Sequence, residues 1–129
     1  MSRTPQEEAN LNLVLAMFEA VLEPMDSSAV DRFIAPGYIQ HNQLAEPGRD
    51  GLKRFLDRIR AETPEAVHDV KRAFVDGDHV IVHYHVRRWP DDRGWAVIDV
   101  FRVEDGLIAE HWDVMQDVVE GGPNPIGPF

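Results

Sequence analysis

The strongest constraint on the fold is a change of hydrophobic pattern at Pro64. Before this residue, apolar side chains recur at the spacing of amphipathic helices. After it, short turn sequences separate four β-rich segments, at about 66–76, 79–89, 94–104 and 107–117. Because these turns are short, neighbouring strands must run antiparallel. The sequence therefore predicts an α+β fold, with helices first and an antiparallel sheet after them.

Three helices are expected before Pro64. The first begins with Thr4 as its cap and Glu7 completing a capping box. The boundaries follow from caps and prolines, and they give helices from Pro5 to Glu23, from Asp26 to Pro36 and from Asp50 to Thr63. Residues 38–42 then lie between the second and third helices.

Length and charge limit the classes of function. The 129 residues fit a single domain, with a Pro- and Gly-rich tail at 118–129 that is either disordered or laid over a partner subunit. The formal net charge of −10 argues against nucleic acid and anionic membranes as partners. The absence of cysteine excludes disulfides and thiolate metal sites. No run approaches the roughly 18 apolar residues of a membrane span, and no apolar signal core follows Met1, so we expect a cytoplasmic protein.

One carboxylate stands in an apolar part of the third β-rich segment. Asp99 shares a strand face with four large apolar residues, Trp95, Val97, Phe101 and Val103. A buried carboxylate is costly unless it is paired, and burial would raise its pKa so that it could donate a hydrogen bond at neutral pH. The alternative is that Asp99 points to solvent, since Ile98 and Val100 are apolar as well. We interpret Asp99 as a pocket residue.

The next segment carries Glu110-His111-Trp112-Asp113, and its register against Asp99 depends on the turn. If Asp105-Gly106 alone forms the loop, Asp99 faces Trp112. If Glu104 also belongs to the loop, Asp99 faces His111, and Asp113 lies one step along on the same side. The sequence permits both registers. The second is preferred on functional grounds, because it gathers three ionisable groups.

Histidines offer two further candidates. His83 and His85 share one face of the second β-rich segment, and with His111 or Asp99 they could ligate a metal, although their spacing matches no established metal motif. We therefore expect no metal and no cofactor. His41 stands between polar neighbours in the interhelical segment, where it is either a local cap or a catalytic base.

Three segments together resemble the SnoaL-like polyketide cyclases of the nuclear transport factor 2-like (NTF2-like) superfamily. They are Tyr38–Asn42, Asp76–Val80 and Asp99–Gln116, of which the last is the most specific. The resemblance implies a cone-shaped α+β fold, with a curved sheet enclosing a pocket, and a homodimer formed through the outer face of the sheet. This fold hosts isomerases, dehydratases, epoxide hydrolases and binding proteins, so the fold alone does not define the reaction.

The resemblance also implies roles for single residues. Asp113 falls where the cyclases place their general acid/base aspartate. Asp99 falls where ketosteroid isomerases place a protonated aspartic acid in the oxyanion hole. His41 lies near the segment that carries the general base of those isomerases.

The resulting hypothesis is a cofactor-independent lyase or isomerase acting on a small carbonyl compound. Asp113 or His41 would remove a proton beside the carbonyl, and Asp99 would stabilise the enolate. Candidate substrate contacts are His111, His83, Tyr38, Phe33, Phe101 and Trp112. The alternatives are a small-molecule-binding dimer of the same fold without catalysis, and a metal-dependent enzyme with His and Asp ligands.

Overall fold

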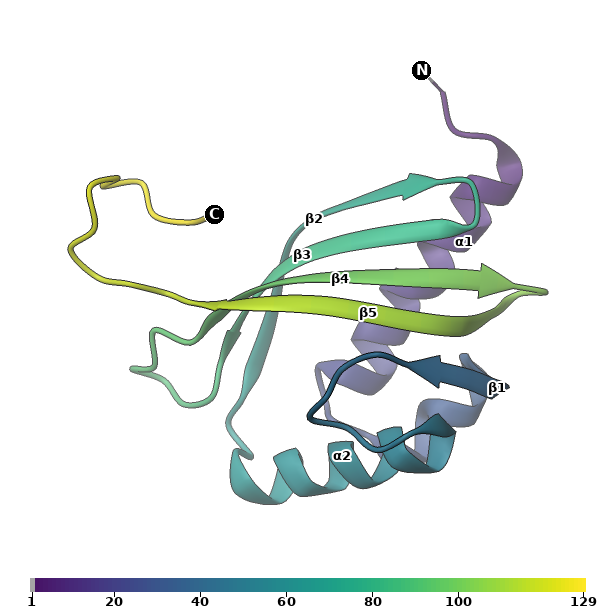
Figure 1. Ribbon diagram of the computed structural model, residues 1–129, viewed down its shortest axis with the longest axis horizontal. Helices are drawn as coiled ribbons and strands as arrows, with labels where there is room; N and C mark the ends of the chain where they lie inside the picture. The colour runs from purple at the N-terminus through teal and green to yellow at the C-terminus, as the bar shows by residue number, and fades with distance from the viewer. Residues whose placement is uncertain (1) are drawn as a thin grey trace.

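Five strands form one curved, open sheet, and two α-helices lie against its inner face (Figure 1). The computed structural model describes residues 2–129. Along the sheet the strand order is β1-β5-β4-β3-β2. The strands are β1 Ile34–Gln40, β2 Val67–Asp76, β3 His79–Arg87, β4 Trp95–Glu104 and β5 Leu107–Asp117. The predicted α+β class is confirmed, and the last four strands form the expected antiparallel meander.

The first helix begins as the sequence predicts. α1 (Pro5–Met17) has Thr4 as its N-cap, and the side chains of Thr4 and Glu7 form the reciprocal hydrogen bonds of a capping box. The helix continues as one π-helical turn, Phe18–Leu22. The apolar side of this whole segment belongs to the core, and α1 packs against β2 and β3.

The second predicted helix is wrong in its second half. A short 3₁₀ helix, Ser27–Arg32, follows the Asp26 cap, but the chain then enters β1, which was expected to be helix end and linker. β1 pairs in parallel with β5, so the sheet is not wholly antiparallel. The sequence pattern of β1 is weak because its pairing partner lies some seventy residues away along the chain. A register shift around Pro36-Gly37 also interrupts the alternation of inward and outward side chains.

The third helix, α2 (Gly48–Glu62), ends at Thr63 as predicted but begins earlier than expected. Pro47 occupies the N-cap position, and Asp50 lies in the first turn, where a carboxylate is favourable beside the helix dipole. At Gly51 an added Cβ would collide with the backbone of Glu46, so the loop before α2 packs directly on the helix.

The register between β4 and β5 differs from both predicted alternatives. Asp105 and Gly106 form the two-residue turn with positive φ angles, but Ala109 then bulges out of the ladder, between the pairs Arg102–Glu110 and Val103–Ile108. The extra residue brings Asp99 opposite Asp113, rather than opposite Trp112 or His111.

Two further features of the fold concern its helices and its C-terminal tail. In the part of the chain that the structure describes, no helix is long and apolar enough to cross a membrane. The tail, expected to be disordered or on a partner, returns to its own sheet, where the ring of Phe129 contacts the rings of His83 and His85.

Candidate functional site

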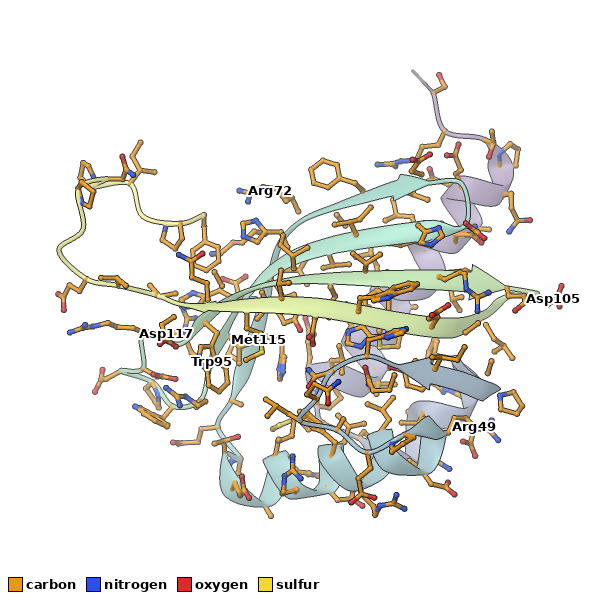
Figure 2. All side chains as sticks on the ribbon, viewed as in Figure 1. Arg49, Arg72, Trp95, Asp105, Met115 and Asp117 are labelled. Carbon is orange, nitrogen blue, oxygen red and sulfur yellow. The ribbon has the colours of Figure 1, made fainter. Side chains whose placement is uncertain are left out.

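A cavity of about 150 Å³ lies between the inner face of the sheet, β1 and α2. Its wall is mostly apolar, built from the inner face of α2 and from alternate residues of β3, β4 and β5. Trp95 and Met115 lie near one another at one end of it, on the α2 side of the sheet (Figure 2). A cavity of this size accommodates a small aromatic molecule. The mouth is open, so a longer ligand can extend outward.

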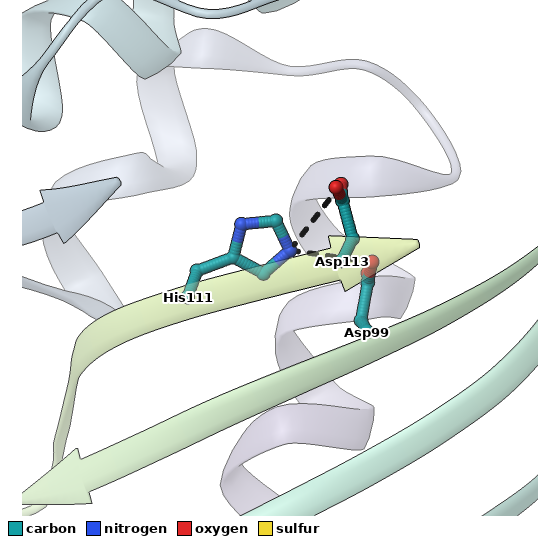
Figure 3. Close-up of side chains that lie close together, drawn as sticks. All are labelled: Asp99, His111 and Asp113. Atoms are coloured by element: carbon teal, nitrogen blue, oxygen red, sulfur yellow. Dashed lines mark ion pairs between the residues drawn. The ribbon is translucent and has the colours of Figure 1, made fainter. Parts of the chain in front are cut away.

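Three ionisable side chains meet in this apolar wall. Asp99 comes from β4, and His111 and Asp113 come from β5, all on the same side of the sheet (Figure 3). The Nε2 atom of His111 lies 3.2 Å from Oδ1 of Asp99 and 3.8 Å from Oδ2 of Asp113. Asp99 is 2% exposed and His111 7%, so both charges interact with little screening by water.

Side chains at the end of β1 hold the cluster in place. Oε1 of Gln40 lies 2.6 Å from Nδ1 of His111 and also accepts the backbone N–H of Asn42, so Nδ1 of His111 is the donor. The Gln40 amide donates to the hydroxyl of Tyr38, and Nδ2 of Asn42 donates to Asp113 at 2.6 Å. With Nδ1 occupied, Nε2 of His111 is directed at the two carboxylates.

The environment changes the proton affinities of these groups. Burial by itself lowers the pKa of His111, but the adjacent Asp99 and Asp113 carboxylates outweigh it and raise the pKa above its usual value. Burial raises the pKa of Asp113, against the opposing effects of His111 and Asn42. Burial and the charge of Asp99 also raise the pKa values of Tyr38 and Tyr84, so both phenols stay neutral donors. The site thus contains a carboxyl group with a raised pKa beside an imidazole whose pKa is also raised, and two phenol O–H groups.

Protein stability is expected to fall as the pH rises through the titration of His111. Because its folded pKa is above the unfolded value of about 6.5, the folded state binds this proton more tightly, and the stabilisation is complete only below that pH. The raised pKa of Asp113 acts in the same direction at lower pH, above about 4. The melting temperature measured from about pH 6 to pH 9 should therefore fall more steeply for the wild type than for His111→Gln. His79→Gln, on the outer face, is the matched control, and a His111→Gln curve parallel to the wild type would contradict this origin.

The structure separates the predicted site residues into two groups. Asp99, His111, Asp113, Tyr38 and Phe101 all line the cavity. His83 and Trp112 lie on strand positions that face the other side of the sheet, and Phe33 packs at the edge of the core.

His41 also lies outside the cavity wall. Strand alternation places Tyr38 and Gln40 inward, so His41 turns outward, where its Nε2 lies 2.8 Å from Glu110 and its ring stacks on Trp112 at 5.0 Å. We therefore give His41 no part in the chemistry proposed below.

Six polar residues of the cavity were missed by the sequence analysis: Gln40, Asn42, Thr63, His68, Tyr84 and Arg88. For Gln40 and Asn42 the sequence did contain a signal, because Tyr38, Gln40 and Asn42 alternate at the period of a β-strand. The segment was interpreted as a linker between helices, so this alternation was not taken to define a face toward the cavity. Tyr84 was noted only as the residue between two histidines.

The alternative of a metal site with His83 and His85 is not supported by the geometry, because these side chains face away from Asp99 and His111. Across residues 2–129, one group of three potential ligands converges, Asp99, His111 and Asp113, whose ligand atoms lie within 4.8 Å of one another. A cation bound by Nε2 of His111 would require the neutral imidazole, whereas the two adjacent carboxylates favour the protonated form.

Comparisons with known proteins agree with this architecture. The sequence model of the SnoaL-like domain matches residues 14–111. No curated protein sequence matches the chain significantly.

Similar solved structures include a candidate polyketide cyclase from Bacillus cereus (20% identity, 88% of this chain and 78% of that one, TM-score 0.75). A candidate SnoaL-like polyketide cyclase from Jannaschia sp. CCS1 is also 20% identical (89% of this chain and 90% of that one, TM-score 0.74). An NTF2-like protein of unknown function from Mesorhizobium loti is similar to the same extent (20% identity, 89% and 97%, TM-score 0.73). At these identities the likeness shows the fold.

Proposed function

The chain belongs to the SnoaL-like domain family, and on this premise we propose that it is a cofactor-independent lyase or isomerase for a small carbonyl compound. The observation that carries the proposal is the convergence of Asp99, His111 and Asp113 at the wall of an apolar cavity. Acid–base catalysis needs a group whose pKa is moved toward the working pH, and the raised pKa of the Asp113 carboxyl meets this need.

Asp113 is the general base in this proposal. Its side chain is held by Asn42 and faces the cavity, where it removes a proton from the carbon next to the substrate carbonyl. The enolate oxygen then accepts a hydrogen bond from Tyr38, and the positive charge of His111, which Asp99 favours, stabilises the negative charge of the enolate. Tyr38 can donate because its oxygen already accepts from Gln40, which orients the hydroxyl.

The enolate can react in two ways that need no external oxidant or reductant. Asp113 returns its proton to a different carbon, which shifts a double bond. Alternatively, the enolate carbon attacks a second carbonyl of the same molecule, and the proton on Asp113 passes to the new alkoxide in an aldol closure. Both use the same three groups, so the shape of the substrate decides between them.

Deuterium exchange tests the proton-removal step without knowledge of the natural substrate. We choose 2-tetralone, a two-ring ketone with acidic α-protons, and follow its deuteration in D₂O by mass spectrometry. The protein should accelerate α-deuteration over buffer at equal pH. Saturable binding of 2-tetralone without acceleration would refute the catalytic proposal and favour the alternative, a small-molecule-binding protein with the same pocket.

We also propose a homodimer through the outer face of the sheet. Apolar side chains gather there on three neighbouring strands, namely Ile81, Ile98, Val100 and Val114, and Val114 is 68% exposed. Exposed apolar surface of this kind is typical of protein–protein contacts. Light scattering after gel filtration should give twice the chain mass for the wild type and for the control Val119→Glu, and the mass of one chain for Ile98→Glu. A monomeric wild type would contradict the dimer.

A further inference from the structure

Four polar side chains lie in one diagonal line across the inner face of the sheet. Asp113 of β5 lies opposite Asp99 of β4, Asp99 lies diagonal to Tyr84 of β3, and Tyr84 lies diagonal to His68 of β2. All four line the cavity. The chemistry proposed above uses the β5 end of this line, and the β2 end has no assigned role.

His68 is the unexplained member of the line. Its Nδ1 atom is buried, and no group within residues 2–129 forms a hydrogen bond with it. Burial lowers the pKa of the ring, against a weaker opposing effect of Asp99, so His68 is a neutral donor and acceptor. A buried polar atom without a partner is destabilising, and such atoms in native proteins call for an explanation.

A second unpartnered atom belongs to another residue of the cavity wall, Asp99. Oδ1 of Asp99 lies 3.2 Å from Nε2 of His111, which is an ion-pair distance. This oxygen nevertheless accepts no hydrogen bond from any group within residues 2–129. About two strand spacings, roughly 10 Å at the backbone, separate β4 from β2. The cavity therefore offers one unsatisfied polar group near the reacting end and another near the far end, with apolar walls between them.

We propose that His68 determines specificity by hydrogen-bonding a second oxygen of the ligand, at the end of the molecule opposite the reacting carbonyl. This inference rests on the proposed function, and it deepens it by naming the substrate class. The substrate is a flat, elongated carbonyl compound of about two rings, apolar in its middle, with a hydroxyl or carbonyl oxygen at its far end. His68 acts on binding and leaves the proton transfer to Asp113.

Two naphthols used as enolate analogues test the assignment. 2-Naphthol carries one hydroxyl, and 2,6-dihydroxynaphthalene carries a second one at the opposite end. Titration calorimetry with the full chain should show that the diol binds the wild type about five- to tenfold more tightly than 2-naphthol, which lies within the range of one net hydrogen bond. This preference is counted beyond the statistical factor of about two for a symmetric diol.

Variants of His68 complete the test. His68→Leu should remove the preference and leave the affinity for 2-naphthol within about twofold, while its melting temperature without ligand should rise by a few degrees, because an unsatisfied buried atom is gone. His68→Asn keeps a polar atom near the position of Nδ1 and should retain part of the preference. His83→Leu, on the outer face, is the matched control and should bind both naphthols as the wild type does.

The outcomes separate the two proposals. Equal affinity of the wild type for both naphthols, or a preference that survives in His68→Leu, would overturn the role of His68 and leave the acid–base proposal standing. If neither naphthol binds the wild type, the carbonyl-binding pocket itself is refuted, and the inference about His68 falls with it.

Discussion

Replacing Asp113 by asparagine should lower the rate of α-deuteration of 2-tetralone by roughly 10²–10⁴-fold, the range lost when a general base is removed. The substitution keeps the shape of the side chain and an oxygen that can accept the hydrogen bond from Asn42, so the cavity should keep its form. It removes the carboxylate that takes the proton. The affinity for 2-naphthol should therefore change far less than the rate.

Asp117→Asn is the matched control for this variant. Asp117 lies on the same strand but is exposed at its end, and it does not line the cavity. The same chemical change there should leave the exchange rate within about twofold of the wild type, as expected for a surface substitution. An Asp113→Asn protein that exchanges 2-tetralone at the wild-type rate would remove Asp113 from the mechanism.

Phe18→Ala should lower the free energy of unfolding by about 3–5 kcal/mol, as measured by urea denaturation. Phe18 is 1% exposed at the start of the π-helical turn, and its ring makes edge-to-face contacts with Tyr84 at 5.0 Å and Phe101 at 5.9 Å. Its removal leaves a void directly beneath the cavity wall and also loses the aromatic pairing energy. We therefore expect weaker binding of 2-naphthol in the molecules that remain folded.

Phe74→Ala tests whether this loss comes from burial. Phe74 is 55% exposed on β2, so the same truncation should cost about 1 kcal/mol or less. Similar losses for the two variants would show that Phe18 does not have the core position that its burial indicates.

The capping box, the break at Pro64 and the four β-rich segments all follow from local signals. Thr4 and Glu7 interact within one turn of helix, and the two-residue turn at Asp105-Gly106 needs residues that accept positive φ. Interactions of this kind depend on neighbours in the chain. They can therefore be predicted from the residues alone, and the structure has them.

The face shared by the three ionisable groups was predicted for a partly wrong reason. The expected three-residue loop and the observed two-residue loop with a bulge at Ala109 differ by an even number of residues in register. Because side chains alternate along a strand, an even shift keeps Asp99, His111 and Asp113 on one face and changes only which residue stands opposite which. The bulge at Ala109 could not be predicted from the sequence. It lies where β5 also pairs with β1, and that pairing joins parts of the chain that are distant in sequence.

The sequence by itself determined the helix-then-meander order and the resemblance to the SnoaL-like family, and it left two registers open, of which only one puts Asp99, His111 and Asp113 on one side of the sheet. Only the tertiary structure decided that residues 34–40 form a strand, which turns Gln40 toward His111 and His41 away from the cavity. It also revealed His68 as a cavity residue without a partner. The physical reason is that periodicity and turn residues act between neighbours in the chain, whereas the partners of a strand and of a buried polar atom come from segments that meet only in the folded protein.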